Sequence, residues 1–158
     1  MKMLNMRLLT MNEKRLENYF AEALRHIQLI EEAKEVIHLP IVNYDKLPNL
    51  EKFAVNALIF RFSKLQDLIG SKIFRAFLEF NKFDTEEKSF LVLLKEIEKE
   101  GIVDIDTWDE FRKIRNNIAH EYPGEEEEAL EAVELLVKKS TDLIKIAQKI
   151  MDRYNEVR

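Results

Sequence analysis

The side chains with the clearest chemical potential are gathered near position 115 of the sequence. Arg115, Asn116 and His120 lie within six consecutive positions, and Tyr122 follows two residues later. Arginine carries a permanent charge on a planar fork that matches a phosphate group, and histidine titrates near neutral pH. Together they suit cleavage of RNA by its own 2′-hydroxyl, with His120 as general base or acid and Arg115 stabilising charge on the phosphorane. Asn116 would orient either the histidine or the phosphate.

These residues are expected at the end of a helix that spans about residues 107–119. Asp106 or Thr107 is the expected N-cap, and the Pro-Gly pair at 123–124 ends the helix. Proline disfavours helical geometry in the residue before it. Tyr122 would therefore be held just past the helix end, close to the histidine.

A helical wheel separates the two charged groups of this segment. Arg115 falls at the edge of an apolar face, where a charge is costly unless it is paired or opens into a cleft. Asn116 and His120 are four residues apart, so they are neighbours on the next face. Arg115 and His120 are about 140° apart around the helix axis. They would converge on one ligand either at the edge of a groove or from two copies of the helix across a two-fold axis.

The same residue types also have a structural interpretation. An arginine and a histidine near a helix end commonly bond the terminal carbonyls and interact with the helix dipole. No group of carboxylates or histidines has clear metal-ligand spacing, so neither a metal nor another cofactor is expected. His26 and His38 are assigned a surface or capping role on the first helix. The glutamates at 125–128 fit the solvated first turn of the last helix.

Hydrophobic periodicity predicts the scaffold that must position these residues. Apolar residues recur every three or four positions, and Gly and Pro number only three each. Gly70 would bend the second helix, Asp84 or Thr85 would cap the third, and Gly101 would end it. The pattern predicts one all-α domain over residues 1–158, an antiparallel up-and-down bundle of four main helices plus a short motif helix, with residues 1–11 frayed. The expected helices span about residues 12–38, 49–80, 85–100, 107–119 and 125–155.

The second expected helix leaves two questions open. Residues 53–62 are apolar nearly all round, which indicates either a central place in the core or an interface with another subunit. Arg61, Lys64 and Asp67 follow one another at spacings of three. They would either line a cleft opposite the motif or form an internal salt bridge or a solvated stripe.

Composition limits the classes of function. The 158 residues include no Cys, which excludes disulfides and thiol chemistry and favours a reducing cytoplasm. No apolar stretch approaches membrane-spanning length, and no secretory signal is expected at the start. The formal net charge of -5 is opposite in sign to that of proteins that coat nucleic acid. Any contact with RNA must therefore be local.

The string Arg115-Asn116-x-x-Ala119-His120-x-Tyr122 resembles the signature of the HEPN superfamily. That signature is an arginine, four to six further residues and a histidine, usually with a polar residue after the arginine. The tyrosine two residues after the histidine is similar to the form found in HepT-like toxins. The order of the expected helices also fits, so the resemblance covers most of the chain, whereas the specific motif covers only its fourth helix.

The resemblance implies a helical bundle that forms a homodimer, with two motifs facing each other across the dimer cleft. It also implies a metal-independent endoribonuclease toxin, with Arg115, Asn116 and His120 as catalytic residues. Its partner would be a minimal nucleotidyltransferase antitoxin on a separate chain, which adenylylates Tyr122. The alternative that the resemblance implies is a non-catalytic subunit that binds a nucleotide or substrate for a two-component nucleotidyltransferase.

Overall fold

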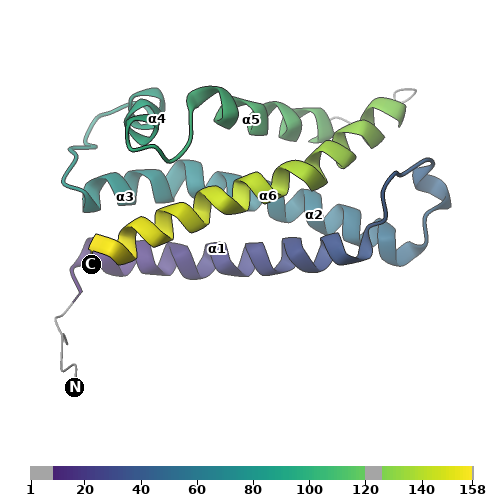
Figure 1. Ribbon diagram of the computed structural model, residues 1–158, viewed down its shortest axis with the longest axis horizontal. Helices are drawn as coiled ribbons and strands as arrows, with labels where there is room; N and C mark the ends of the chain where they lie inside the picture. The colour runs from purple at the N-terminus through teal and green to yellow at the C-terminus, as the bar shows by residue number, and fades with distance from the viewer. Residues whose placement is uncertain (1–8, 120–125, 158) are drawn as a thin grey trace, which may run out of the picture.

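The computed structural model of the chain describes the backbone of residues 9–119 and 126–157 and the side chains of residues 9–117 and 130–157. Within these ranges the protein is a helical bundle without strands, as predicted (Figure 1). A 3₁₀ turn, Tyr44–Lys46, lies between the first two helices, and a π-helical segment, Ile69–Ile73, separates the second from the third. The α-helices are α1 (Met11–Val36), α2 (Asn49–Leu68), α3 (Phe74–Phe80), α4 (Phe90–Lys99), α5 (Ile105–Ala119) and α6 (Glu126–Val157).

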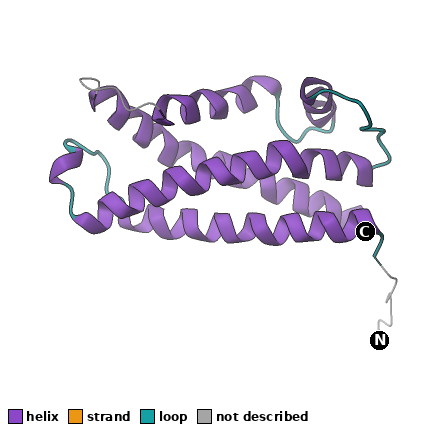
Figure 2. Cartoon of the chain, turned by 180° about the vertical axis from the view of Figure 1, so that it is seen from behind, coloured by secondary structure: helices purple, strands orange, loops and turns teal. Residues whose placement is uncertain are grey.

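The long helices lie roughly along one axis (Figure 1). The chain reverses direction between α1 and the continuous α2–α3 unit, and these two pack along each other. Helix α5 lies on the opposite side of α2 from α1, and α6 crosses the bundle diagonally in contact with α1, α2 and α5. Helix α4 is a short crossing element at one end, seen almost end-on in both views (Figure 2). This arrangement places α5, which carries the motif, directly beside α2.

One continuous hydrophobic core holds these helices together. Helix α1 begins at the N-cap Thr10, whose side chain accepts a hydrogen bond from the Glu13 backbone N–H. Its apolar side then faces α2 and α6, because inward residues recur every three or four positions. The largest fully buried side chains come from several helices: Phe62, Phe74, Phe77, Phe111 and Tyr154.

The predicted interruption at Gly70 is a π-helical segment. A Cβ atom on Gly70 would lie 2.9 Å from Cζ2 of Trp108, which comes from α5. The glycine therefore lets the indole ring of α5 approach the backbone of the second helix closely. The ring also packs on Phe74, with ring centroids 4.8 Å apart, so α5 is held at a fixed position along the α2–α3 unit.

Two predicted helix starts are wrong. Helix α4 begins at Phe90 with Ser89 as its N-cap, not at Asp84 or Thr85. Glu87 has a positive φ of 60°, which breaks the helical path between Thr85 and Ser89, and the Thr85 hydroxyl is directed to Glu79. The predicted end is confirmed, because Gly101 adopts a φ of 74° directly after α4.

Helix α5 begins at Ile105, two residues earlier than predicted, so neither Asp106 nor Thr107 is its cap. The carboxylate of Asp104 accepts a hydrogen bond of 2.7 Å from the Thr107 backbone N–H. That bond holds the pKa of Asp104 below its ordinary value. The acidic cap thus both satisfies the helix start and stabilises it electrostatically.

The two histidines of the N-terminal half differ in their environments. His38 is exposed and contacts Glu51, which confirms its predicted surface role. His26 is buried, so the same prediction is wrong for it: Arg61 donates a 3.2 Å hydrogen bond to its Nδ1. Burial and the neighbouring positive charge of Arg61 lower the pKa of His26. The imidazole therefore serves as a neutral acceptor inside the α1–α2 interface.

The apolar first half of α2 faces both ways. Its inward side chains, such as Val55 and Leu58, belong to the core. Phe53 and Phe60 are 67% and 52% exposed, so an apolar stripe also lies on the outer surface. The place in the core is therefore confirmed for one face of this helix, and an interface with another subunit stays a prediction for the exposed face. No helix within the described ranges is long and apolar enough to cross a membrane.

Candidate functional site

Helix α5 is fixed against α2 by its aromatic residues. Trp108 and Phe111 are buried, with ring centroids 5.9 Å apart, and Phe111 meets Phe62 of α2 at 6.1 Å. Ile114 extends the same buried face by one turn. Arg115 is the next residue, so it lies at the border of this face, as the helical wheel predicted.

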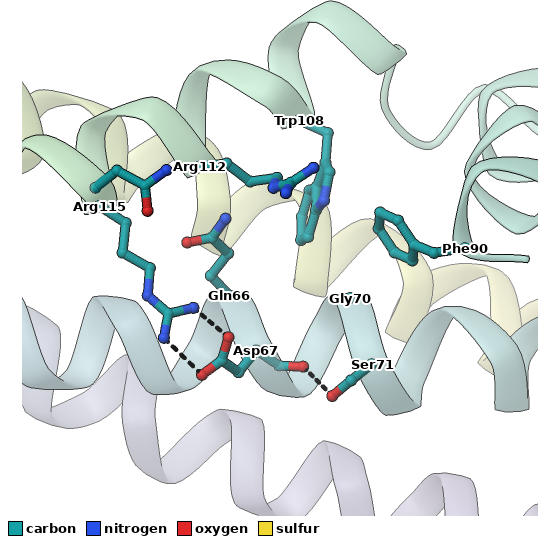
Figure 3. Close-up of a pocket in the computed structure, with 9 residues that line it drawn as sticks. Gln66, Asp67, Gly70, Ser71, Phe90, Trp108, Arg112 and Arg115 are labelled. Carbon is teal, nitrogen blue, oxygen red and sulfur yellow. Dashed lines mark hydrogen bonds and ion pairs between the residues drawn. The ribbon is translucent and has the colours of Figure 1, made fainter.

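The guanidinium of Arg115 is held by Asp67 of α2 (Figure 3). Its Nη1 donates to Oδ1 of the carboxylate, and its Nη2 donates to Oδ2 over 3.0 Å. The two side chains are 36% and 51% exposed, so solvent screens the pair and it contributes at most about 1 kcal/mol to stability. The main effect of this two-pronged contact is to fix the plane and direction of the guanidinium.

Of the three polar residues predicted on the second helix, only Asp67 reaches the motif. Arg61 donates to His26 of α1 instead, a contact that the sequence did not predict. Lys64 lies over the ring of Phe60, with its Nζ 5.5 Å from the ring centroid. Of the three predicted residues, only Asp67 therefore belongs to the site.

Arg115 and Asp67 lie at the edge of a cavity of about 560 Å³ between α5, α2 and the start of α4. A glycine and two aromatic residues form part of its wall: Gly70, Phe90 and Trp108. Two guanidinium groups and an amide reach it from α5, and an amide, a carboxylate and a hydroxyl from the α2–π segment (Figure 3). These polar residues are Arg112, Arg115, Asn116, Gln66, Asp67 and Ser71.

One polar group of the cavity is both buried and unpartnered. The side chain of Gln66 is 4% exposed, and its Oε1 has no hydrogen-bond partner. Figure 3 shows this side chain rising from α2 between Arg115 and Trp108. The hydroxyl of Ser71, in contrast, is satisfied, because it donates to the backbone carbonyl of Asp67. The site therefore contains a buried acceptor that has no donor.

The structure brings together two of the four residues singled out in the sequence. Arg115 and Asn116 both line the cavity, and Asn116 is exposed. His120 and Tyr122 lie outside the described residues. Their expected places, beside Asn116 and just beyond the helix end, stay predictions.

Sequence reasoning missed Arg112, Gln66 and Phe90 as parts of the site. Arg112 is four residues before Asn116, so the same wheel that placed the motif would have found it on the same face. Gln66 is four residues after the buried Phe62, and a glutamine on an inward face is a recognisable departure from the usual pattern. Phe90 carried no such signal, because its place depends on where α4 begins.

Comparison with protein-family models, with curated proteins and with solved structures finds no match to this chain. Within the part of the chain that the structure describes, no three His, Cys, Asp or Glu residues are grouped as metal ligands. The features of this chain that bear on its function are therefore the motif, the helical bundle and the cavity beside Arg115.

Proposed function

We propose that this protein is a metal-independent endoribonuclease toxin related to the HEPN superfamily. The observation that supports the proposal most strongly is the forked contact of Arg115 at the edge of a cavity. A guanidinium with a fixed plane at an accessible position is preorganised for the oxygens of a phosphodiester.

In the proposed reaction, the 2′-hydroxyl of RNA attacks the adjacent phosphorus. His120 removes the hydroxyl proton or gives a proton to the departing 5′-oxygen. Arg115 stabilises the extra negative charge of the phosphorane, and Asn116 orients the phosphate beside it. The phosphate would replace Asp67 on part of the guanidinium fork, because both anions use the same donors.

The proposed active form is a homodimer that uses the outer face of α2. One side of α2 connects the exposed phenylalanines with the residue that binds Arg115. Its residues follow one another at helical spacing: Phe53, Ala57, Phe60, Lys64 and Asp67. Burying one exposed phenylalanine contributes about 1.5–3 kcal/mol, which favours a second subunit on this face. A subunit on this face would bring its own motif towards the same cleft.

The dimer is tested by light scattering coupled to size-exclusion chromatography. We expect a mass of about twice 18.8 kDa for the wild type and a monomer for the double variant Phe53→Glu, Phe60→Glu. The double variant Leu135→Glu, Val157→Glu, on α6, is the control, because it introduces the same two charges at exposed apolar positions outside the α2 face. A monomeric wild type would contradict this part of the proposal.

The ribonuclease activity is tested by expressing the protein without a partner. Wild-type protein should slow growth and degrade cellular RNA, and His120→Ala and Arg115→Ala should abolish both effects. Arg15→Ala removes an exposed arginine from α1 and should behave as the wild type. Equal growth and equal RNA integrity for all four proteins would contradict the proposal.

The proposed partner is a minimal nucleotidyltransferase that inactivates the toxin by adding adenylate to Tyr122. Incubation with the partner and ATP should increase the mass of the wild type by one adenylate group, and Tyr122→Phe should stay unmodified. Unchanged mass with an active partner would reject the modification while leaving the ribonuclease proposal in place.

The second candidate is a non-catalytic subunit that binds a nucleotide for a separate nucleotidyltransferase. The size of the cavity favours it, since small-molecule sites commonly enclose about 300–1,000 Å³. The net charge of -5 also fits a small local site better than an extended RNA surface. This candidate predicts nucleotide binding and complex formation without any cleavage of RNA.

A further inference from the structure

Gln66 places a buried amide in the wall of the cavity. Buried polar atoms are nearly always hydrogen-bonded, because an unpaired acceptor that is removed from water destabilises the folded protein. Oε1 of Gln66 has no partner, although the side chain is 4% exposed and lines the cavity. The missing donor can therefore come from a molecule that enters this cavity.

The wall next to Gln66 is aromatic and rigid. Trp108 is 2% exposed and is held between Phe74 and Phe111. The absence of a side chain at Gly70 leaves room for the indole ring at that position. Phe90 is 37% exposed and lines the cavity from the start of α4. Flat aromatic surfaces beside a polar acceptor suit a planar heterocycle.

The charged groups of the cavity lie on its α5 side. Arg112 and Arg115 line it there, and Asp67 neutralises only one positive charge. An anionic group would bind at this side while a planar ring reaches Gln66. A nucleotide combines both features, and a base is available to such a pocket only when it is unpaired and turned out of the strand.

We infer that this cavity binds one unpaired nucleobase through a hydrogen bond from a base N–H to Oε1 of Gln66, next to the phosphate that Arg115 contacts. The inference rests on the proposed function only in taking RNA as the source of the base. It adds a base-recognition subsite to a motif that otherwise contacts the phosphate and the 2′-hydroxyl. Gln66 is a specificity residue in this site, not a catalytic one.

The chain contains one tryptophan, so the fluorescence of Trp108 reports directly on the cavity. Purified wild-type protein is titrated with AMP, CMP, GMP and UMP, and separately with ribose 5-phosphate and inorganic phosphate. At least one nucleotide should change the fluorescence at concentrations at which the two compounds without a base do not. Equal responses to nucleotides and ribose 5-phosphate, or no response to either, would overturn the inference.

Gln66→Leu and Gln66→Met remove the acceptor and replace the amide with an apolar side chain of similar size. Both should weaken the best nucleotide about tenfold, as expected for the loss of one hydrogen bond in a buried site. Neither should lower the thermal midpoint, because the removed oxygen has no partner in the free protein. Gln148→Leu, at an exposed position of α6, is the matched control and should bind as the wild type. Unchanged nucleotide affinity in both Gln66 variants would overturn the inference.

The two proposals fail in different ways. In one outcome, nucleotide binding depends on Gln66, but there is no RNA cleavage that depends on Arg115. That outcome supports the base subsite and refutes the ribonuclease. The opposite outcome combines two results. RNA cleavage depends on Arg115, and the wild type and both Gln66 variants have the same kcat/KM on RNAs that differ only beside the cut. That outcome supports the ribonuclease and refutes the subsite.

Discussion

Replacing Gly70 with alanine should destabilise the protein, although the same change in an ordinary helix is stabilising. Alanine is favoured over glycine inside a helix by about 0.8–1.0 kcal/mol. At this position, however, the new Cβ would lie 2.9 Å from Cζ2 of Trp108, and the indole cannot move easily because it packs on Phe74 and Phe111. Overpacking of this kind costs about 1–3 kcal/mol. The net expectation is a loss of about 1 kcal/mol, or about 2–4 °C in the thermal midpoint of a chain of this size.

A double-mutant cycle separates the two effects. Trp108→Phe removes the part of the ring that the new methyl group would meet, so Gly70→Ala in that background should gain up to about 1 kcal/mol. Phe90→Leu is the matched control, because Phe90 comes only within 3.7 Å of the new Cβ, an ordinary contact, and Gly70→Ala should stay destabilising there. Urea unfolding is followed by far-UV circular dichroism, since Trp108→Phe has no tryptophan. A change in stability on Gly70→Ala with the same sign and size in the wild type and in Trp108→Phe would show that the indole contact does not cause it.

Three further predictions concern charges. The pKa of His26 is lowered from 6.5 by burial and by Arg61. The contribution of this histidine to stability is therefore present above pH 6.5 and is lost as the pH falls below it. Between pH 7.5 and 5.5, the urea midpoint of His26→Gln should change less than that of the wild type. The pKa of Asp104 is lowered from 3.8 by the helix-start hydrogen bond, so Asp104→Asn should lower the thermal midpoint at pH 7 and matter less below pH 3.8. Alanine variants of Asp67 and Arg115 should show a coupling energy of at most about 1 kcal/mol in urea unfolding, because both groups are partly exposed; a coupling above 2 kcal/mol would show that the pair is structural.

The helical bundle was predictable because apolar spacing is a local property of each segment. The helix boundaries were less so, and α4 shows why. Asp84, Thr85 and Ser89 are all competent N-caps by residue type. The choice of Ser89 depends on contacts across the fold, since Thr85 donates to Glu79 and its carbonyl accepts from Arg75. A preference among similar caps is small, so a few such contacts are enough to decide it.

The candidate site was likewise predictable only in part. The border position of Arg115 follows from the wheel of its own helix, because Trp108 and Phe111 define the buried face. Its partner Asp67 was among the polar residues proposed to face the motif, but nothing in the sequence separated it from Arg61 and Lys64. That separation comes from the relative register of α2 and α5, which the packing of Trp108 against Gly70 helps to set.

Helix α2 departs from the usual helical pattern in two opposite ways, and both departures are informative. Phe53 and Phe60 point outward, which forgoes about 1.5–3 kcal/mol for each ring, and Gln66 points inward with an unpaired oxygen at a cost of about 1–3 kcal/mol. These costs are comparable in size to the stability of a whole domain. They fall within 14 residues of one helix that ends beside Arg115. Such local conflicts are expected where a surface or cavity is completed by another molecule. A second subunit would cover the phenylalanines, and a base donor would satisfy the glutamine, so the same helix serves both the proposed dimer and the proposed base subsite.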